Sequence, residues 1–322
     1  MKNFITRLII FLLPLLLLAY PLDMLLTNAL KNSHEYAGEI EVWNDIYDGK
    51  INADILIYGS SRAWKHINPQ ILEDSLGLST YNLGMDGHIF WSQYFRHQTY
   101  LLHNLTPKMI VLSLDIFSLE TNKNIGLYNK NQFLPYMYCN ETMHEYTKPY
   151  KGFSWVDFNV PLIRYLFNQK ATLHALMSIV ALNKKPYRNK GYKGFDVLWD
   201  YNFEKAKLKK ENYYATTDGA AVNLLEQFIS ECATKKIELL LIYSPEYIAG
   251  QQFTKHREDV MKTYTTLASK HHLQFIDYSS NEICYRKELF FNALHLNLKG
   301  SEIFSKTLAA DLKNYKKAHY YF

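Results

Sequence analysis

Cysteine is scarce in this chain, and the few residues present lie far apart. Among 322 residues there are three cysteines, Cys139, Cys232 and Cys284, with no C-x-x-C pair and no histidine cluster beside them. Zinc sites and disulfide frameworks depend on such spacings. The sequence therefore indicates neither, although one disulfide remains open, and it predicts no metal site and no cofactor.

A concentrated patch of one charge is also missing. The net charge is +5, and Lys and Arg are scattered among Asp and Glu. Nucleic-acid-binding proteins need clustered basic residues to contact phosphates, so no nucleic-acid partner is predicted. Low-complexity tracts are lacking as well, and 48% of the residues are hydrophobic, which predicts a folded chain with a buried core.

Charge is absent from one long stretch near the amino terminus. Residues 8–22 are uncharged and mostly apolar, follow Lys2 and Arg7, and precede Asp23. A positively charged start followed by an apolar run is typical of a membrane-targeting segment. Because the run is apolar all round, it does not fit a buried amphipathic helix.

Two interpretations of this segment remain open. An uncleaved anchor over residues 1–30 needs about 20 apolar residues, which the segment reaches if residues 24–26 are included and Asp23 lies near the headgroups. A secretory signal peptide, cleaved after residues 27–29, fits the shortness of the run and Pro14. We favour the anchor, which places residues 31–322 on the extracytoplasmic side, periplasmic or extracellular; cleavage would make the domain a secreted one.

Short apolar runs alternate with helical patterns along the rest of the chain. The runs are typical of buried strands because they are rich in Ile, Leu and Val and end in small or polar residues. The predicted strands are residues 54–58, 80–83, 109–115, 237–243 and 273–277, and the predicted helices are residues 89–104, 221–234 and 304–315. The alternation predicts an α/β domain whose mostly parallel sheet is covered by helices on both faces.

The alternation stops between about residues 117 and 217. This stretch is rich in Tyr, Asn and Lys, and it predicts an insertion within one domain spanning residues 31–322. Loops at the carboxyl ends of parallel strands build the ligand crevice, so an insertion after Asp115 is placed to shape substrate choice. A peripheral helical addition is an equally good interpretation.

A candidate nucleophile follows the first predicted strand. Gly59-Ser60-Ser61 lies where an open α/β sheet presents catalytic groups, and a helix starting there would direct backbone N–H groups at an oxyanion. A base is offered by His295, because Asn292 lies three residues earlier and can orient the imidazole. The pattern predicts Ser61 as nucleophile and His295 as its base.

Three blocks in this order resemble the SGNH (GDSL-like) hydrolase superfamily. They are Gly59-Ser60-Ser61, residues 82–87 with the pattern N-x-G-x-x-G, and residues 292–295, where the family has D-x-x-H. The resemblance covers roughly residues 50–116 and 220–316. It implies a flavodoxin-like three-layer α/β/α sandwich, with Ser61 as nucleophile, His295 as base, and the N–H groups of Ser61 and Gly87 lining the oxyanion hole.

The chain departs from that family at two positions. Ser113-Leu114-Asp115 replaces the G-x-N-D block, whose asparagine serves the family's oxyanion hole, and Asn122 in the following loop is a candidate substitute. Asn292 replaces the aspartate; its amide can orient an imidazole but cannot stabilise imidazolium by charge. The alternatives are a Ser-His dyad, another carboxylate such as Asp86 or Asp115, or loss of hydrolysis.

The remaining polar residues near these blocks carry weaker signals. Arg62, beside Ser61, is a candidate substrate-binding residue for an anionic group, although a solvated or sheet-edge role fits it better. His66, His88 and His97 occur singly, without a metal-ligand pattern, and no role is predicted for them.

The motifs predict a serine esterase that removes O-acyl groups, such as acetyl, from a glycan through an acyl-Ser61 intermediate. A second hypothesis follows from the resemblance and the anchor: an O-acyltransferase accessory that works with a multipass membrane acyltransferase on a cell-envelope polysaccharide. A third is a degenerate, non-catalytic glycan-binding module, because two family residues are replaced.

Overall fold

The computed structural model describes residues 2–87, 89–120, 129–148, 152–180 and 185–319. The chain forms two compact units. Unit 1 comprises residues 1–44 and 122–187, and unit 2 comprises residues 45–121 and 188–322. The predicted insertion is divided between them, because residues 122–187 belong to unit 1 and residues 188–217 to unit 2.

Unit 2 contains a five-stranded sheet in the order β2-β1-β3-β5-β7, and every neighbouring pair is parallel. Its strands are β1 (Ile55–Gly59), β2 (Thr80–Asn82), β3 (Met109–Leu114), β5 (Glu238–Tyr243) and β7 (Phe275–Asp277). This is the strand order of flavodoxin-like doubly wound folds. The predicted α/β class and parallel sheet are confirmed.

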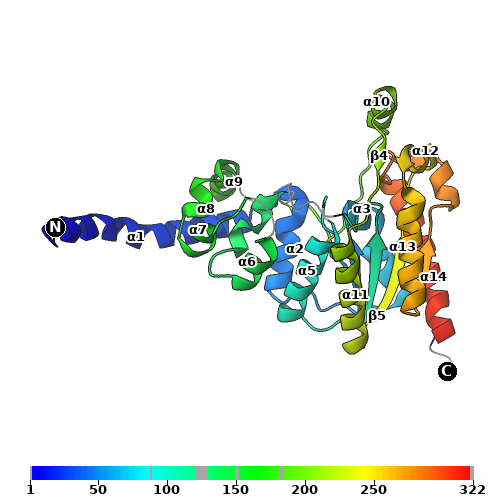
Figure 1. The fold of residues 1–322 in the computed structure, drawn as a ribbon, viewed down its shortest axis with the longest axis horizontal. Helices are drawn as coiled ribbons and strands as arrows, with labels where there is room; N and C mark the ends of the chain where they lie inside the picture. The colour runs from blue at the N-terminus through cyan, green and yellow to red at the C-terminus, as the bar shows by residue number, and fades with distance from the viewer. Residues whose placement is uncertain (1, 88, 121–128, 149–151, 181–184, 320–322) are drawn as a thin grey trace. The chain divides into compact units, whose positions relative to one another are not determined.

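Helices cover both faces of this sheet (Figure 1). On β1, Ile55 and Ile57 point to one face and belong to a buried cluster with residues from α3, α4 and α14. Tyr58 points to the opposite face, where it contacts Phe228 of α11. The helices are α3 (Ser61–His66), α4 (Pro69–Leu76), α5 (Phe90–His103), α11 (Gly219–Thr234), α13 (Arg257–Lys270) and α14 (Leu298–His319).

Local sequence determines where several of these helices begin and end. Asn68 caps α4 by accepting a hydrogen bond from the N–H of Gln70, and Gly77 ends the helix in the left-handed conformation. Asp218 caps α11 in the same way, accepting from the N–H groups of Ala220 and Ala221. These caps fix the helix boundaries, while the apolar face of each helix supplies its packing.

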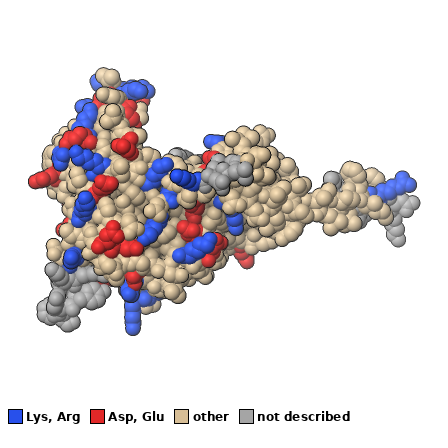
Figure 2. Space-filling view, turned by 180° about the vertical axis from the view of Figure 1, so that it is seen from behind, with Lys and Arg blue, Asp and Glu red and all other residues tan. Residues whose placement is uncertain are grey.

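Unit 2 also contains shorter elements outside the five-stranded sheet. They are α10 (Asn202–Leu208), β4 (Tyr213–Tyr214), α12 (Ile248–Phe253), β6 (Thr254–Lys255), η3 (Glu282–Tyr285) and η4 (Lys287–Leu289). Strands β4 and β6 form a separate two-stranded parallel pair. On the face of unit 2 visible in Figure 2, Lys and Arg are interspersed with Asp and Glu.

All the secondary structure in the described residues of unit 1 is helical. Its elements are α1 (Lys2–Lys31), η1 (Tyr36–Gly38), most of α2 (Glu39–Tyr47), η2 (Lys130–Tyr136), α6 (Glu141–Thr147), α7 (Trp155–Asn159), α8 (Ile163–Leu166) and α9 (Gln169–Val180). Trp43 lies in its core and donates a hydrogen bond to Gln132 at 3.0 Å.

The predicted membrane anchor is wrong. Within the described residues, no helix combines the length and apolar character that crossing a bilayer requires. Asp23, which we expected near the headgroups, is buried in unit 1, where Arg164 forms an ion pair with it at 2.6 Å and the N–H of Leu162 donates to it at 2.7 Å. The end of α1 therefore belongs to the folded core of unit 1, and the membrane-anchored location is corrected.

The three cysteines form no disulfide with one another. Cys139, Cys232 and Cys284 are free thiols, and the last two are buried. Burial raises the pKa of the Cys232 thiol to about 12 and that of Cys284 to about 11. Both therefore behave as small core residues.

Candidate active site

The candidate nucleophile is the first residue of α3, directly after β1. Ser60 caps this helix by accepting a hydrogen bond from the N–H of Arg62 at 3.2 Å, which leaves Ser61 at the amino end. Gly59 has φ +145°, and a Cβ there would lie 2.6 Å from the carbonyl oxygen of Ser113. Only glycine fits this turn, which carries the chain sharply from strand to helix.

The structure brings Ser61 and His295 together although 234 residues separate them in sequence. The Ser61 Oγ lies 2.8 Å from Nε2 of His295, and Nδ1 of His295 lies 3.0 Å from Oδ1 of Asn292. Ser61 is buried, with 8% of its surface exposed. Nucleophile, imidazole and orienting group thus form a continuous chain of hydrogen bonds, as nucleophilic catalysis requires.

The tautomer of His295 follows from the contacts of Asn292. The Oδ1 of Asn292 accepts hydrogen bonds from the backbone N–H groups of Leu294 at 3.0 Å and His295 at 2.9 Å. An atom that accepts from two N–H groups is the amide oxygen, so it can only accept from the imidazole as well. The proton of neutral His295 therefore lies on Nδ1, and the lone pair of Nε2 faces the Ser61 hydroxyl.

The segment that carries His295 is held in a tight turn. The N–H of Phe291 donates to the carbonyl oxygen of His295 at 3.0 Å, and Phe290 and Leu296 form a β-bridge. The ring of Phe291 stacks on the imidazole, with centroids 5.3 Å apart and an interplanar angle of 5°. The imidazole thus has one ring face covered and both nitrogens bonded, which fixes its orientation.

The electrostatic environment favours the neutral form of His295. Burial lowers its pKa well below the usual value, and the cations Lys65 and Arg62 lower it further. Lys65 lies one helical turn after Ser61, with its Nζ 5.9 Å from the centroid of the Phe291 ring. His295 is therefore unprotonated, and competent as a base, at neutral pH and below.

This environment predicts the pH dependence of any reaction that uses His295. Since its folded pKa lies below about 6.5, kcat/KM for an aryl ester should stay level as the pH falls through 6.5 and decline only at lower pH. Lys65→Met removes a cation, raises the pKa of His295 and moves this decline to higher pH. Measuring kcat/KM from about pH 4.5 to 8 checks both; a decline moved to lower pH in the variant contradicts the assignment.

The second block lies against the start of α3. Asn82 donates from Nδ2 to the carbonyl oxygens of Ala63 and Ile67, both at 2.9 Å, and its Oδ1 accepts from the N–H of Gly84 at 3.0 Å. A Cβ on Gly84 would lie 2.7 Å from the N of Trp64, so glycine permits this close approach. The hydrogen bonds of Asn82 thus join the end of β2 to the helix that carries Ser61.

The expected oxyanion donors are placed only in part. The N–H of Ser61 lies in the first turn of α3, where helical N–H groups have no intrahelical acceptor. Gly87 adopts φ +65°, a left-handed conformation that suits glycine in the turn after Asp86. Asn122, the predicted substitute for the third donor, lies outside the described residues.

The predicted role of Arg62 at a substrate surface is wrong, and so is a solvated one. Arg62 is 1% exposed, because residues that follow β3 and β5 enclose its guanidinium. Its Nη1 lies 3.0 Å from Asp115 and 3.6 Å from Glu246, and its Nη2 donates to the carbonyl oxygen of Ser244. The guanidinium therefore joins α3 to the ends of β3 and β5 instead of contacting substrate.

Neither alternative carboxylate replaces the missing aspartate. Asp115, which follows β3, is fully buried; it accepts a hydrogen bond from the Ser60 hydroxyl and forms an ion pair with Arg62. Asp86 accepts from the indole N–H of Trp64 at 3.2 Å and lies 3.4 Å from Lys65. The group hydrogen-bonded to Nδ1 of the base is the amide of Asn292.

Sequence reasoning missed two buried groups beneath this site. Glu246 accompanies Arg62, and His66 contacts the segment after His295. A buried acid beside a buried arginine is recognisable only when the strand order is known. Of the other single histidines, His97 is buried and lies 3.1 Å from the hydroxyl of Tyr58, and His88 lies outside the described residues.

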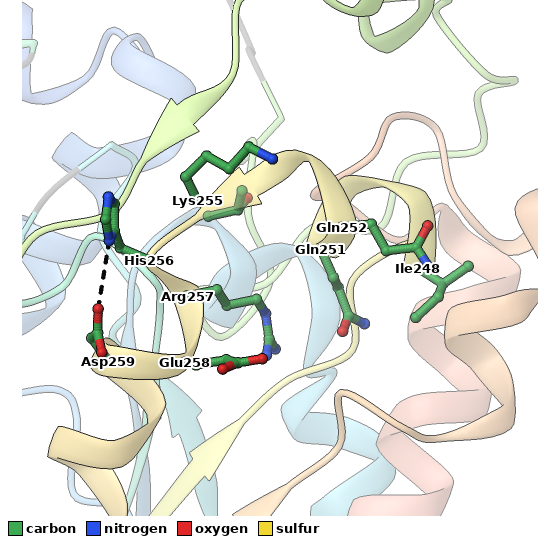
Figure 3. Close-up of a pocket in the computed structure, with 9 residues that line it drawn as sticks. Ile248, Gln251, Gln252, Lys255, His256, Arg257, Glu258 and Asp259 are labelled. Atoms are coloured by element: carbon green, nitrogen blue, oxygen red, sulfur yellow. Dashed lines mark ion pairs between the residues drawn. The ribbon is translucent and has the colours of Figure 1, made fainter.

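A separate polar cavity of about 530 Å³ lies where α12, β6 and the start of α13 meet (Figure 3). Two of its lining residues, His256 and Asp259, form an ion pair at 3.5 Å. Arg257, also in its lining, donates to Glu246 at 3.2 Å. Its lining consists of Ile248, Gln251, Gln252, Thr254, Lys255, His256, Arg257, Glu258 and Asp259, without Ser61 or His295.

No protein-family model matches the chain, and neither does any curated protein. Solved structures similar to it include one described as a lipolytic protein of the G-D-S-L family from Desulfitobacterium hafniense, with 10% identity, a TM-score of 0.37, and coverage of 80% of this chain and 98% of that one. An acetyl xylan esterase has 11% identity, a TM-score of 0.40, and coverage of 81% and 98%.

A third similar structure, described as an acylhydrolase from Bacteroides fragilis, has 9% identity, a TM-score of 0.39, and coverage of 86% of this chain and 98% of that one. At these TM-scores no residue role and no substrate is transferred to this chain. The SGNH-like fold that the three blocks predict stands on the chain's own features: the strand order, the turn at Gly59, and the approach of residues 292–295 to Ser61.

Proposed function

We propose that unit 2 is a serine esterase of the SGNH type that removes acyl groups, acetyl among them, from a glycan. One observation carries this proposal: Nε2 of His295, with its lone pair free of a proton, lies 2.8 Å from the Ser61 hydroxyl while Asn292 holds the other ring nitrogen. This is the geometry that a nucleophile and its general base require.

The reaction follows from these contacts. As Ser61 Oγ bonds to the ester carbonyl carbon, its proton moves to Nε2 of His295 and the carbonyl oxygen becomes an oxyanion near the N–H of Ser61. Collapse breaks the bond to the alcohol oxygen, which takes the proton from Nε2. Water then attacks the acyl-Ser61 carbonyl and His295 accepts its proton. As the bond between Oγ and the acyl carbon breaks, Nε2 returns that proton to Oγ, and the acid is released with Ser61 and His295 restored.

Asn292 affects the energetics of this sequence. Its amide oxygen keeps the imidazole proton on Nδ1, which is the tautomer that catalysis requires. An asparagine that offered its NH₂ group to the imidazole would select the wrong tautomer. Asn292 supplies no negative charge to the imidazolium, and Lys65 and Arg62 also disfavour that cation. The base is therefore a weak one, and turnover should be slower than for a site with a carboxylate partner.

The glycan part of the proposal is supported by the polar cavity. Helix α12 begins next to the segment that carries His295. The N–H of Tyr247, the N-cap residue of α12, donates to the carbonyl oxygen of Ala293 at 3.0 Å. Gly250 of α12 is also in close contact with Ala293. Amide and charged side chains such as Gln252 and Lys255 suit the many hydroxyl groups of a sugar.

Labelling with a fluorophosphonate tests the nucleophile. The probe should modify the Ser61 peptide of the intact chain, and Ser61→Ala and His295→Ala should abolish that modification, as read by mass spectrometry. Ser230→Ala, which changes an exposed serine of α11, serves as the control and should leave labelling intact. Labelling that persists in Ser61→Ala removes the assignment.

Acyl transfer is distinguished from hydrolysis by the fate of the acyl group. With acetylated polysaccharide as donor, hydrolysis releases acetate, whereas transfer to an added glycan acceptor conserves it on a hydroxyl. Polysaccharide binding that is unaffected by Ser61→Ala, with no labelling of the wild type, would instead indicate a non-catalytic module.

A further inference from the structure

The helix that presents Ser61 also contacts the segment of its base. α3 is six residues long, with Ser61 at its first position and His66 at its last. The N–H of Leu296, the residue after His295, donates to Nε2 of His66 at 3.0 Å. One short helix therefore carries the nucleophile and also contacts the segment that carries its base.

The contacts of His66 determine its protonation. Because Nε2 accepts from a backbone N–H, the ring proton lies on Nδ1, where Ser244 Oγ accepts it at 3.3 Å. The ring is fully buried, and its edge meets the His295 ring with centroids 6.0 Å apart. Burial, together with Arg62, lowers the pKa of His66 well below its usual value, so Nε2 stays available as an acceptor.

The backbone of His66 is also fixed. The Oγ of Ser305 in α14 accepts from the N–H of Asn68 at 2.8 Å, and its one proton is shared between the carbonyl oxygens of Ser301 at 2.7 Å and His66 at 3.2 Å. Ser244 follows β5, so the imidazole joins α3, the end of β5 and the segment of residues 290–296. Both ring nitrogens of His66 form hydrogen bonds. The side chain therefore does more than fill space, for which an apolar residue would suffice.

Resting on the proposed esterase, we propose that His66 is a positioning residue: through its hydrogen bond to Leu296 it sets the separation between Ser61 Oγ and His295 Nε2. It does not touch the reacting atoms. Nucleophilic attack depends steeply on that separation, since a misplacement of about 1 Å can cost about a hundredfold in rate. Loss of the acceptor should therefore lower kcat and leave KM nearly unchanged.

Three variants of the intact chain test this. His66→Phe keeps a ring but removes the acceptor, and it should lower the fluorophosphonate labelling rate and kcat for an aryl acetate by about ten- to a hundredfold. His66→Gln offers an amide oxygen to Leu296 and should recover most of that loss. His97→Phe, which removes another buried histidine bonded to Tyr58, is the matched control and should stay within about twofold of the wild type.

A second measurement separates this proposal from the proposed function. Amide hydrogen exchange at Leu296 should accelerate by about tenfold or more in His66→Phe and remain slow in His97→Phe. A wild type that is neither labelled nor active overturns the esterase, and exchange at Leu296 still decides whether His66 holds the segment. Unchanged exchange in His66→Phe, or equal losses of kcat in His66→Phe and His97→Phe, overturns the positioning role.

Discussion

Replacing Ser61 with alanine is expected to lower kcat for an aryl acetate by about 10⁴-fold or more, and replacing His295 with alanine by a similar factor. Each change removes the same event, because the hydroxyl attacks only as its proton passes to Nε2 across the 2.8 Å contact. The double variant should therefore be no slower than either single one. Steady-state kinetics of the four proteins measures this directly.

The neighbouring Ser60 cannot replace Ser61 as the nucleophile in these variants. Its hydroxyl donates to the buried carboxylate of Asp115 and caps α3, so it is unavailable for attack. Activity that survived Ser61→Ala could not be assigned to Ser60 on this geometry. Losses that add up in the double variant would show that Ser61 and His295 act independently, which contradicts a nucleophile and its base.

Much of unit 2 follows from sequence because its central strands, β1 and β3, are buried on both faces. Such strands are continuous apolar runs, and the predicted strand at residues 109–115 corresponds to β3 at Met109–Leu114. The predicted helix at residues 221–234 likewise lies within α11 at Gly219–Thr234. Caps and apolar spacing are local properties, so they are readable without the fold.

The residues of the candidate site also fall into two groups, those that local sequence predicts and those that only the structure reveals. Ser61, Asn292 and His295 occur in short blocks whose spacing marks them, and the structure brings these three side chains together. His66 and Glu246 occur in no such block. Their roles depend on which strand ends are neighbours in space, which local sequence does not specify.

Arg62 and Asp23 show why sequence alone predicts the wrong environment for some charged residues, since both are buried. An arginine beside a nucleophile is exposed by default, because charged residues are rarely buried unless paired. Arg62 pairs with Asp115 and Glu246, and Asp23 pairs with Arg164; each of these partners is more than fifty residues away in sequence. An apolar run ending in a charge resembles a membrane segment until the distant partner of that charge is known.

Replacing Arg62 with methionine should destabilise unit 2 by about 3–5 kcal/mol, the usual consequence of removing one partner from a buried ion pair. Methionine fills much of the space but leaves the carboxylates of Asp115 and Glu246 buried without their shared cation. Urea denaturation at pH 7 measures the loss. Lys287→Met, which breaks the exposed ion pair with Glu204, is the control and should change stability little.

The pH dependence of this loss identifies its cause. Burial already raises the pKa of Asp115, and Arg62 is the largest influence that lowers it, so the variant's Asp115 has a pKa higher still. An acid whose folded pKa exceeds its unfolded pKa destabilises the folded state once the pH rises above the unfolded value, and it ceases to do so as the pH falls. The stability difference between Arg62→Met and wild type should therefore shrink between pH 7 and about pH 5. A difference that stays constant over this range would mean that the guanidinium acts through packing alone, and that the buried charges of Asp115 and Glu246 do not depend on it.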